Sequence, residues 1–254
     1  YNHLWLLINA RSEFCLTYKC NRYDGCYYGY IKKQAKQSDL LIVNHSMMVS
    51  YQDKQDSLVS DNAICIVDEC HNFPSICQKQ SSKSVSIKKI KEYKESYLKI
   101  LKMFENKKRT TFKIQSKDLL EIIDDLIDSF QKFSENFYSL NVANQFKSEY
   151  IQNISINRDN IFPSNDGSAQ NYLVTLNKLI LGFKDHRLDL DNIKEDISKN
   201  TLQEFDFLLS NLENLYLISD IIINNTDNSI NWFSYRHMDN YLDSFSFNLA
   251  PENL

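Results

Sequence analysis

Glycine and proline are scarce in this sequence, with four glycines and three prolines in 254 residues. The glycines are Gly25, Gly29, Gly167 and Gly182, and none of them precedes a Lys-Ser or Lys-Thr pair. P-loop enzymes hold nucleotide phosphates with a glycine-rich loop that ends in Gly-Lys-Ser/Thr. Residues 1–254 therefore lack this half of a nucleotide site, and we expect them to hydrolyse no ATP on their own.

Two other features are absent as well. No apolar run reaches the about 18 residues that span a membrane. The first residues lack the basic flank and cleavage site of a signal peptide. We therefore expect no membrane association and a cytoplasmic protein, in which free thiols persist. With 43% hydrophobic and 24% charged residues and a net charge of −4, the chain is expected to fold around one or two cores.

An apolar run, Ala63–Val67, is followed directly by the sequence Asp68-Glu69-Cys70-His71. A short β-branched run of this kind is typical of a strand buried on both faces of a parallel sheet. Carboxylates at the carboxyl end of such a strand lie where open α/β folds bind ligands. Asp68 can then hold Mg²⁺ through water, and Glu69 can orient an attacking water. The pattern predicts a Walker B element; the alternative is a strand capped by two solvated acids.

The cysteines near the start form a second candidate site. Cys15, Cys20 and Cys26 have the spacing C-x4-C-x5-C, and three thiolates this close can bind one soft metal or cluster. Zinc sites usually contain C-x2-C, so the wider spacing favours an iron-sulfur cluster. A zinc site with His3 or His45 as fourth ligand and a set of plain reduced thiols are the alternatives.

The remaining cysteines, Cys65, Cys70 and Cys77, are expected to be packing residues.

Basic and aromatic residues alternate in residues 1–37. Cations neutralise phosphates and rings stack on unpaired bases, so this composition suits single-stranded nucleic acid. The residues are Arg11, Lys19, Arg22, Lys32, Lys33 and Lys36, with Tyr18, Tyr23, Tyr27, Tyr28 and Tyr30 between them. Residues 81–110 form a second basic stretch, for which a solvated helix face is an equally good explanation.

The rest of the chain shows helical periodicity. Three apolar stripes with three- and four-residue steps lie within residues 119–137, 172–183 and 202–218, and they predict three long helices with a shared core. Polar breaks at 155–167 and 184–200 predict turns between antiparallel helices. Bulky residues alternate in Asn231–Arg236, which predicts a strand.

The cysteine triplet, the stretch Ser38–Met48 and the hexad Ile66–His71 together resemble the DinG branch of the XPD/DinG iron-sulfur helicases, over residues 11–77. The resemblance implies a [4Fe-4S] cluster held by Cys15, Cys20, Cys26 and an upstream cysteine. It also implies that Asp68 binds Mg²⁺, Glu69 activates the water that attacks ATP, and His71 couples the nucleotide site to DNA-facing motifs. Cys70 stands where the family commonly has alanine, a small-for-small change.

The resemblance implies a mixed α and α/β fold: part of a P-loop helicase motor domain with parallel-sheet strands, an inserted iron-sulfur loop domain and a mostly α-helical arch domain. We expect residues 1–37 to be the C-terminal part of the iron-sulfur region and residues 38–80 to be part of the first motor domain. Residues 81–230 would be the arch. Residues 231–254 would return to the motor domain, where Phe247–Leu254 resembles the start of the second one.

The implied function is that of a central fragment of an ATP-dependent DNA helicase. Such an enzyme moves 5′ to 3′ on single-stranded DNA and opens duplexes, branched DNA or R-loops in repair and replication. It would act as a monomer, with a single-stranded-DNA-binding protein as a possible partner. One truncation upstream of Tyr1 would account for both the missing phosphate loop and the fourth cysteine.

Two alternatives belong to other classes. One is a single-stranded nucleic-acid-binding or scaffold protein derived from such a helicase but lacking its motor. The other is a zinc-binding helical interaction module, for which Asp68 and Glu69 would be incidental. Metal content separates this last reading from the others, because iron with sulfide excludes zinc as the native metal.

Overall fold

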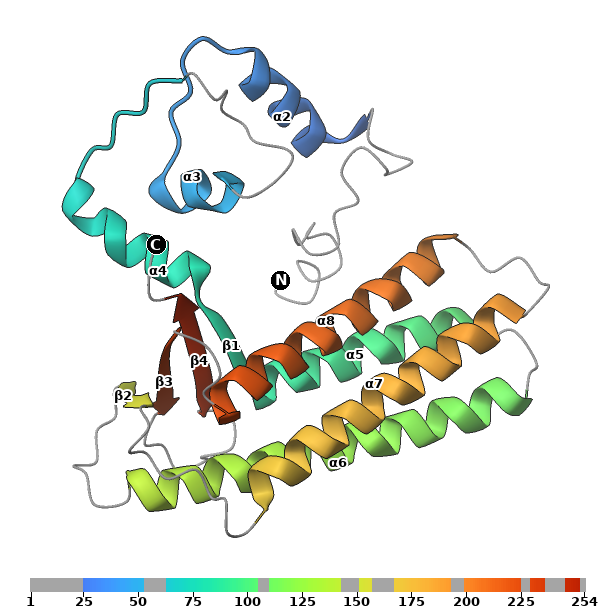
Figure 1. Cartoon of the computed structure of the whole chain (residues 1–254). Helices are drawn as coiled ribbons and strands as arrows, with labels where there is room; N and C mark the ends of the chain where they lie inside the picture. The colour runs from blue at the N-terminus through green and yellow to red at the C-terminus, as the bar shows by residue number, and fades with distance from the viewer. Residues whose placement is uncertain are drawn as a thin grey trace. The chain divides into compact units, whose positions relative to one another are not determined.

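The structure is a computed structural model that describes residues 25–52, 63–104, 110–142, 151–156, 167–192, 199–224, 229–235 and 245–251. The chain divides into two compact units (Figure 1). Unit 1 comprises Tyr1–Ser81 with Leu254, and unit 2 comprises Ser82–Asn253.

The described part of unit 1 consists of short helices joined by extended segments. They are α2 (Tyr27–Gln37), α3 (His45–Gln52), the 3-10 turn η3 (Cys70–Asn72) and α4 (Phe73–Ser81). The side-chain oxygen of Asn44 accepts the backbone N–H of Met47 at 2.8 Å, so Asn44 caps the start of α3. The His45 ring lies edge-on to Phe73, with ring centroids 5.5 Å apart. This contact and a hydrogen bond from Ser50 to Gln80 join α3 to α4.

The strand expected at Ala63–Val67 is not formed. These residues have no regular structure, and Ile64 and Ile66 are 92% and 91% exposed. The segment before α3 is similar, with Leu40 and Ile42 at 78% and 87% exposure. A strand buried on both faces needs neighbouring strands and covering helices. The described residues of unit 1 contain no strand, so the parallel-sheet part of the expected fold is not seen there.

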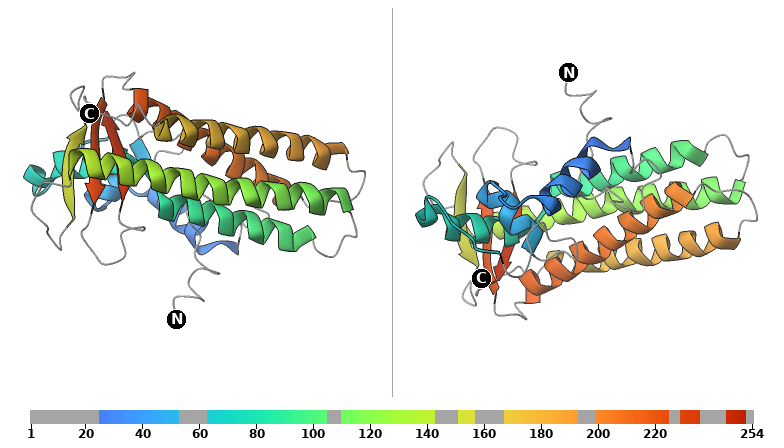
Figure 2. Two further views of the ribbon diagram at one scale, coloured as in Figure 1. Left: turned by 90° about the horizontal axis from the view of Figure 1, so that it is seen from below. Right: turned by 90° about the horizontal axis from the view of Figure 1, so that it is seen from above.

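Unit 2 contains four long helices and four short strands. The helices are α5 (Ile87–Phe104), α6 (Thr110–Asn141), α7 (Ser168–Asn192) and α8 (Lys199–Asn224). Figure 2 shows them running side by side with the strands at one end of the bundle. The apolar stripes predicted from the sequence all fall on α6, α7 and α8 and are confirmed as helix. The break expected to begin at Lys184 is wrong, because α7 continues to Asn192.

The strands form one antiparallel sheet in the order β1-β4-β3-β2. They are β1 (Lys83–Ser86), β2 (Gln152–Ile156), β3 (Ser229–Tyr235) and β4 (Ser246–Pro251). The strand predicted at Asn231–Arg236 is thus present as β3, and it pairs inside unit 2. Mostly helical architecture with a small sheet is therefore what the described residues show.

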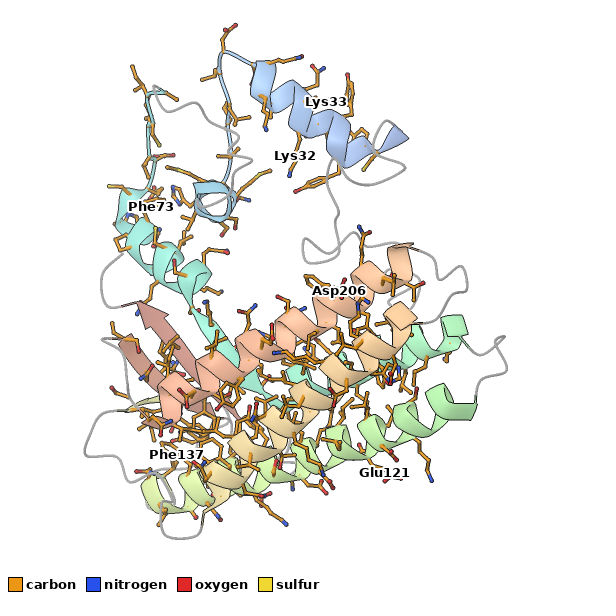
Figure 3. All side chains as sticks on the ribbon, turned by 45° about the vertical axis from the view of Figure 1, so that its right-hand side comes forward. Lys32, Lys33, Phe73, Glu121, Phe137 and Asp206 are labelled. Carbon is orange, nitrogen blue, oxygen red and sulfur yellow. The ribbon has the colours of Figure 1, made fainter. Side chains whose placement is uncertain are left out.

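An aromatic core joins the sheet to the helices. Val85, Phe247, Phe233 and Ile154 lie opposite one another in register across the four strands. Phe247 stacks on Phe133 of α6, with ring centroids 4.7 Å apart and an interplanar angle of 12°. Phe137, labelled in Figure 3 near the end of α6 and its neighbouring strands, lies 4.9 Å from Phe233 between ring centroids. Within the described ranges, no helix combines the length and apolar character needed to cross a membrane.

Candidate functional site

The acidic motif forms a tight turn between the extended segment 63–67 and α4. Glu69 has φ 49° and ψ 41°, the left-handed conformation, and is the one non-glycine residue with positive φ in the described chain. This conformation costs an L residue of order 1–3 kcal/mol and is often kept at functional sites. The turn is closed by the backbone N–H of Asn72, which donates to the Glu69 carbonyl at 3.0 Å.

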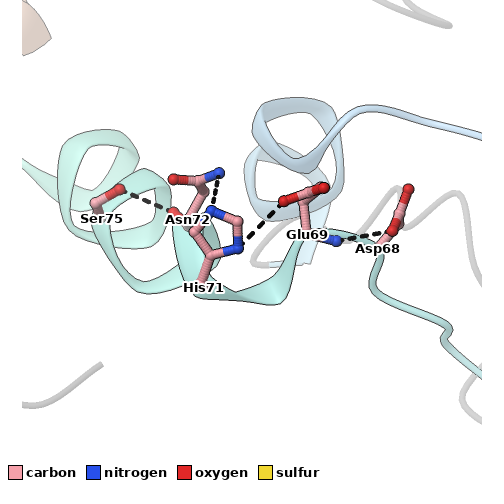
Figure 4. Close-up of polar contacts among 5 residues, drawn as sticks. All are labelled: Asp68, Glu69, His71, Asn72 and Ser75. Atoms are coloured by element: carbon pink, nitrogen blue, oxygen red, sulfur yellow. Dashed lines mark hydrogen bonds and ion pairs between the residues drawn. The ribbon is translucent and has the colours of Figure 1, made fainter.

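This turn brings Glu69 and His71 into direct contact (Figure 4). The Nδ1 atom of His71 lies 3.2 Å from Oε2 of Glu69. On the other side of the ring, Nδ2 of Asn72 lies 3.0 Å from Nε2 of His71. An amide NH₂ can only donate, so Nε2 accepts and the ring proton of neutral His71 is on Nδ1, where it is donated to the Glu69 carboxylate.

Asp68 faces a different partner. Its Oδ1 accepts the backbone N–H of Glu69 at 2.9 Å, and the side chain is exposed. A hard, solvent-facing carboxylate oxygen is the kind of ligand that Mg²⁺ takes, usually with several waters retained. The residues present thus fit the magnesium role predicted for Asp68, while Glu69 and His71 act as one hydrogen-bonded pair.

Asn72 is a site residue that the sequence reasoning missed. Besides its contact with His71, its carbonyl accepts the Ser75 hydroxyl at 2.8 Å. Asn72 is therefore tied both to the histidine and to the first turn of α4. The sequence feature that could have identified Asn72 is its position directly after His71, because asparagine side chains often hydrogen-bond to neighbouring groups in turns.

The structure describes one of the three expected cluster ligands. Cys15 and Cys20 lie outside the described residues. Cys26 is half-buried at the N-cap of α2, and its thiol makes no capping hydrogen bond, although its carbonyl accepts the N–H of Tyr30 at 2.9 Å. The described part of the chain holds no group of three or more His, Cys, Asp or Glu side chains suited to a metal ion.

The other thiols differ from expectation. Cys65 and Cys70, expected to be packing residues, are exposed in this structure, and Cys65 donates to the sulfur of Met48 at 3.7 Å. The exposure of Cys65 goes with the missing strand at residues 63–67, because no strand among the described residues of unit 1 covers this segment. Cys77 is half-buried in α4. His45, named above as an alternative zinc ligand, packs edge-on against Phe73.

Helix α2 presents the basic and aromatic residues expected to face nucleic acid. Tyr27, Tyr28 and Tyr30 are 76%, 37% and 58% exposed. Nζ of Lys32 lies 5.1 Å from the centroid of the Tyr28 ring, a cation–π contact. Lys33 is exposed on the same helix, and Figure 3 labels both lysines. The helix therefore combines exposed rings with cations.

Comparison with known proteins supports a helicase-type assignment for the first third of the chain. Residues 12–90 match the DEAD_2 family. The chain is 26% identical over 90 residues to "ATP-dependent DNA helicase YoaA" of Escherichia coli, covering 34% of this chain and 14% of that protein. It is 33% identical over 75 residues to "3'-5' exonuclease DinG" of Staphylococcus aureus, covering 30% of this chain and 8% of that protein.

The matched part thus spans less than a sixth of the length of these relatives. Over this part, the resemblance to DinG/XPD-type helicases is confirmed.

Proposed function

We propose that this chain is part of an ATP-dependent DNA helicase of the DinG/XPD type, to which it contributes the Asp-Glu-x-His motif, an iron-sulfur loop and a helical arch. The observation that carries the proposal is that the Asp68–His71 turn, with its paired Glu69 and His71 side chains, lies inside the segment that matches the DEAD_2 family. The proposed whole enzyme moves 5′ to 3′ on single-stranded DNA in the cytoplasm and opens duplexes, branched DNA or R-loops.

The roles of the three motif residues follow from their contacts. Asp68 would hold Mg²⁺, which supplies charge neutralisation for the phosphates of ATP. Glu69 would orient the attacking water, and its carboxylate already accepts the His71 ring proton. Because His71 is linked to Glu69 on one nitrogen and to Asn72 on the other, a shift of α4 would move the catalytic carboxylate. This link is a physical route by which DNA-facing parts could act on the nucleotide site.

The exposed apolar residues of unit 1 also support the proposal. Ile64 and Ile66 are the residues that a central strand would bury, as are Leu40 and Ile42 in the segment before α3. Exposure of such side chains in two segments is best explained by sheet strands and helices that the described residues of unit 1 do not include. We propose that the remainder of the first motor domain covers them.

Cys26 fits the proposed iron-sulfur loop. Its thiol is partly accessible at the start of α2, where the helix dipole favours negative charge. Cys15 and Cys20 would be the other two ligands in this chain, and a fourth cysteine would come from elsewhere.

A measurement of ATP hydrolysis tests the proposal. Residues 1–254 contain no Gly-Lys-Ser/Thr loop, so we expect no DNA-stimulated turnover above background. In the protein expressed from its complete native reading frame, DNA should stimulate ATP hydrolysis, and Glu69→Gln should lower kcat by about 100-fold or more. Glu121→Gln, a matched change on the exposed face of α6, should leave kcat unchanged.

Two results would contradict this reading. The first is turnover by residues 1–254 that disappears on Glu69→Gln, because these residues would then need no further loop. The second is a native reading frame that supplies no phosphate loop.

The second result would favour the motor-less alternative, a single-stranded nucleic-acid-binding protein. The observation behind that alternative is the exposed tyrosine and lysine surface of α2, which suits base stacking and phosphate neutralisation.

A further inference from the structure

An apolar stripe runs along the outer side of α7 in unit 2. Val174, Leu181 and Leu188 are 55%, 53% and 61% exposed, although the helices of a bundle normally turn such apolar residues toward the core. They are seven residues apart, so successive members are rotated by only about 20° and form one line along the helix. The buried side of α7, which includes Leu176 and Phe183, faces the opposite direction.

The outer stripe is defined here as Val174, Leu181 and Leu188. On another side of the helix, the ion pairs Lys184–Glu213 and Arg187–Asp206 join α7 to the antiparallel α8, with N–O distances of 2.7 and 2.6 Å.

The charges beside the stripe are arranged so that they complement a second copy. Lys178 and Asp185 are both exposed, lie on the same flank of the stripe and are also seven residues apart. Neither has an opposite charge three or four positions away on α7, where helix neighbours pair.

If a second α7 is laid antiparallel with Leu181 opposite Leu181, then Val174 faces Leu188, and Lys178 lies on the same flank as Asp185 of the second copy, within one residue, about 1.5 Å, of its level. Each of these two pairs occurs twice, because the arrangement has a two-fold axis.

We propose that the outer stripe of α7 is a self-association surface, through which two copies of this chain pair with their α7 helices antiparallel. The apolar residues form the seam, and the two Lys178–Asp185 pairs fix its register. The seam is well below the about 800 Å² per partner of a standard interface, so the dimer is weak, with a Kd on the order of 10–100 µM. The monomer implied by the family resemblance then describes the dilute protein.

Sedimentation equilibrium of residues 1–254, from about 5 to 500 µM and under reducing conditions, measures this association directly. We expect a reversible monomer–dimer equilibrium. Leu181→Glu places two like charges at the two-fold axis and should raise Kd about tenfold or more. Leu140→Glu is the control, since Leu140 on α6 is 57% exposed and lies outside the stripe; its Kd should match the unchanged protein. Far-UV circular dichroism checks that all variants are folded.

A charge exchange separates self-pairing from docking of some other partner. Lys178→Asp alone should raise Kd about threefold to tenfold, and the double variant Lys178→Asp with Asp185→Lys should restore it to within about threefold. A protein that stays monomeric at 500 µM overturns the proposal. So does a dimer that Leu181→Glu leaves intact, or a double variant no tighter than Lys178→Asp. The proposed ATPase role is untouched by any of these outcomes, because α7 holds none of its residues.

Discussion

His186 of α7 is buried in an aromatic environment that disfavours its charged form. The ring is 1% exposed and stacks on Phe205, with ring centroids 5.7 Å apart and an interplanar angle of 11°. Tyr97 of α5 meets it edge-on at 6.4 Å. Burial lowers the pKa of His186 from 6.5 to about 4, and the nearby carboxylate of Asp189 opposes this change only in part.

This lowered pKa predicts that unit 2 loses stability in mild acid. In the unfolded chain His186 takes up a proton near pH 6.5, whereas in the folded chain it does so only near pH 4. The contribution of neutral His186 to the free energy of unfolding is therefore fully present above about pH 6.5 and is lost as the pH falls towards 4. The loss is on the order of 3 kcal/mol. His186→Phe keeps the ring stacking and removes the titrating group.

Urea unfolding between pH 4 and pH 7.5 checks this. The free energy of unfolding of the unchanged protein should fall more steeply with acid than that of His186→Phe, and the carboxylates act as an internal control because both proteins share them. Parallel pH profiles would show that His186 does not govern acid stability.

At the scale of elements, one buried hydrogen-bond chain joins α7 to α8. The Ser219 hydroxyl donates to the Leu215 carbonyl at 2.7 Å, so its own proton is used within α8. The Tyr172 hydroxyl, 2.9 Å from Ser219 Oγ, must then be the donor to it. Both side chains are buried, and burial also raises the pKa of Tyr172, which keeps its proton in place.

Because Tyr172 donates to Ser219 and Ser219 donates to Leu215, removal of the two hydroxyls should have unequal effects on stability. Ser219→Ala leaves the Tyr172 hydroxyl buried without an acceptor and should destabilise unit 2 by about 1–3 kcal/mol. Tyr172→Phe removes the donor but leaves Ser219 bonded to Leu215, and should cost about 0.5–1.5 kcal/mol. Chemical denaturation of both variants tests the order; a costlier Tyr172→Phe would mean that the hydrogen bond runs the other way. Ser139→Ala, on the exposed face of α6, should change little.

At the scale of the whole molecule, the packed core belongs to unit 2. Among the described residues, every buried apolar side chain of the core lies between Val85 and Ala250. The strands β1 and β4, from opposite ends of this range, pair in register and close the unit. In the described part of unit 1, by contrast, Gly29 is the buried residue.

This distribution predicts that residues 82–254 fold without residues 1–81. Expressed alone, they should show a cooperative thermal transition by circular dichroism, with a Tm within about 5 °C of the main transition of the full chain. Residues 1–81 alone are the matched control and should show no cooperative transition. Loss of folding in 82–254 would mean that unit 1 contributes to the core.

The helical framework of this protein could be predicted from sequence because its signal is local. The stripe Leu119 to Phe137 repeats every three to four residues, and that spacing alone places these side chains on one side of α6. The alternation in Asn231–Tyr235 predicted β3 for the same reason. Asp68, Glu69 and His71 could be singled out because their residue types and order carry chemical meaning without coordinates.

Tertiary structure decided what depends on distant parts of the chain. Whether Ala63–Val67 becomes a strand depends on neighbours that would bury Ile64 and Ile66, and composition cannot show whether they are present. The pairing of β1 with β4 joins segments about 160 residues apart, which no local period encodes. Likewise, the Glu69–His71 contact is made in the left-handed turn at Glu69, a backbone conformation that the residue types alone do not specify.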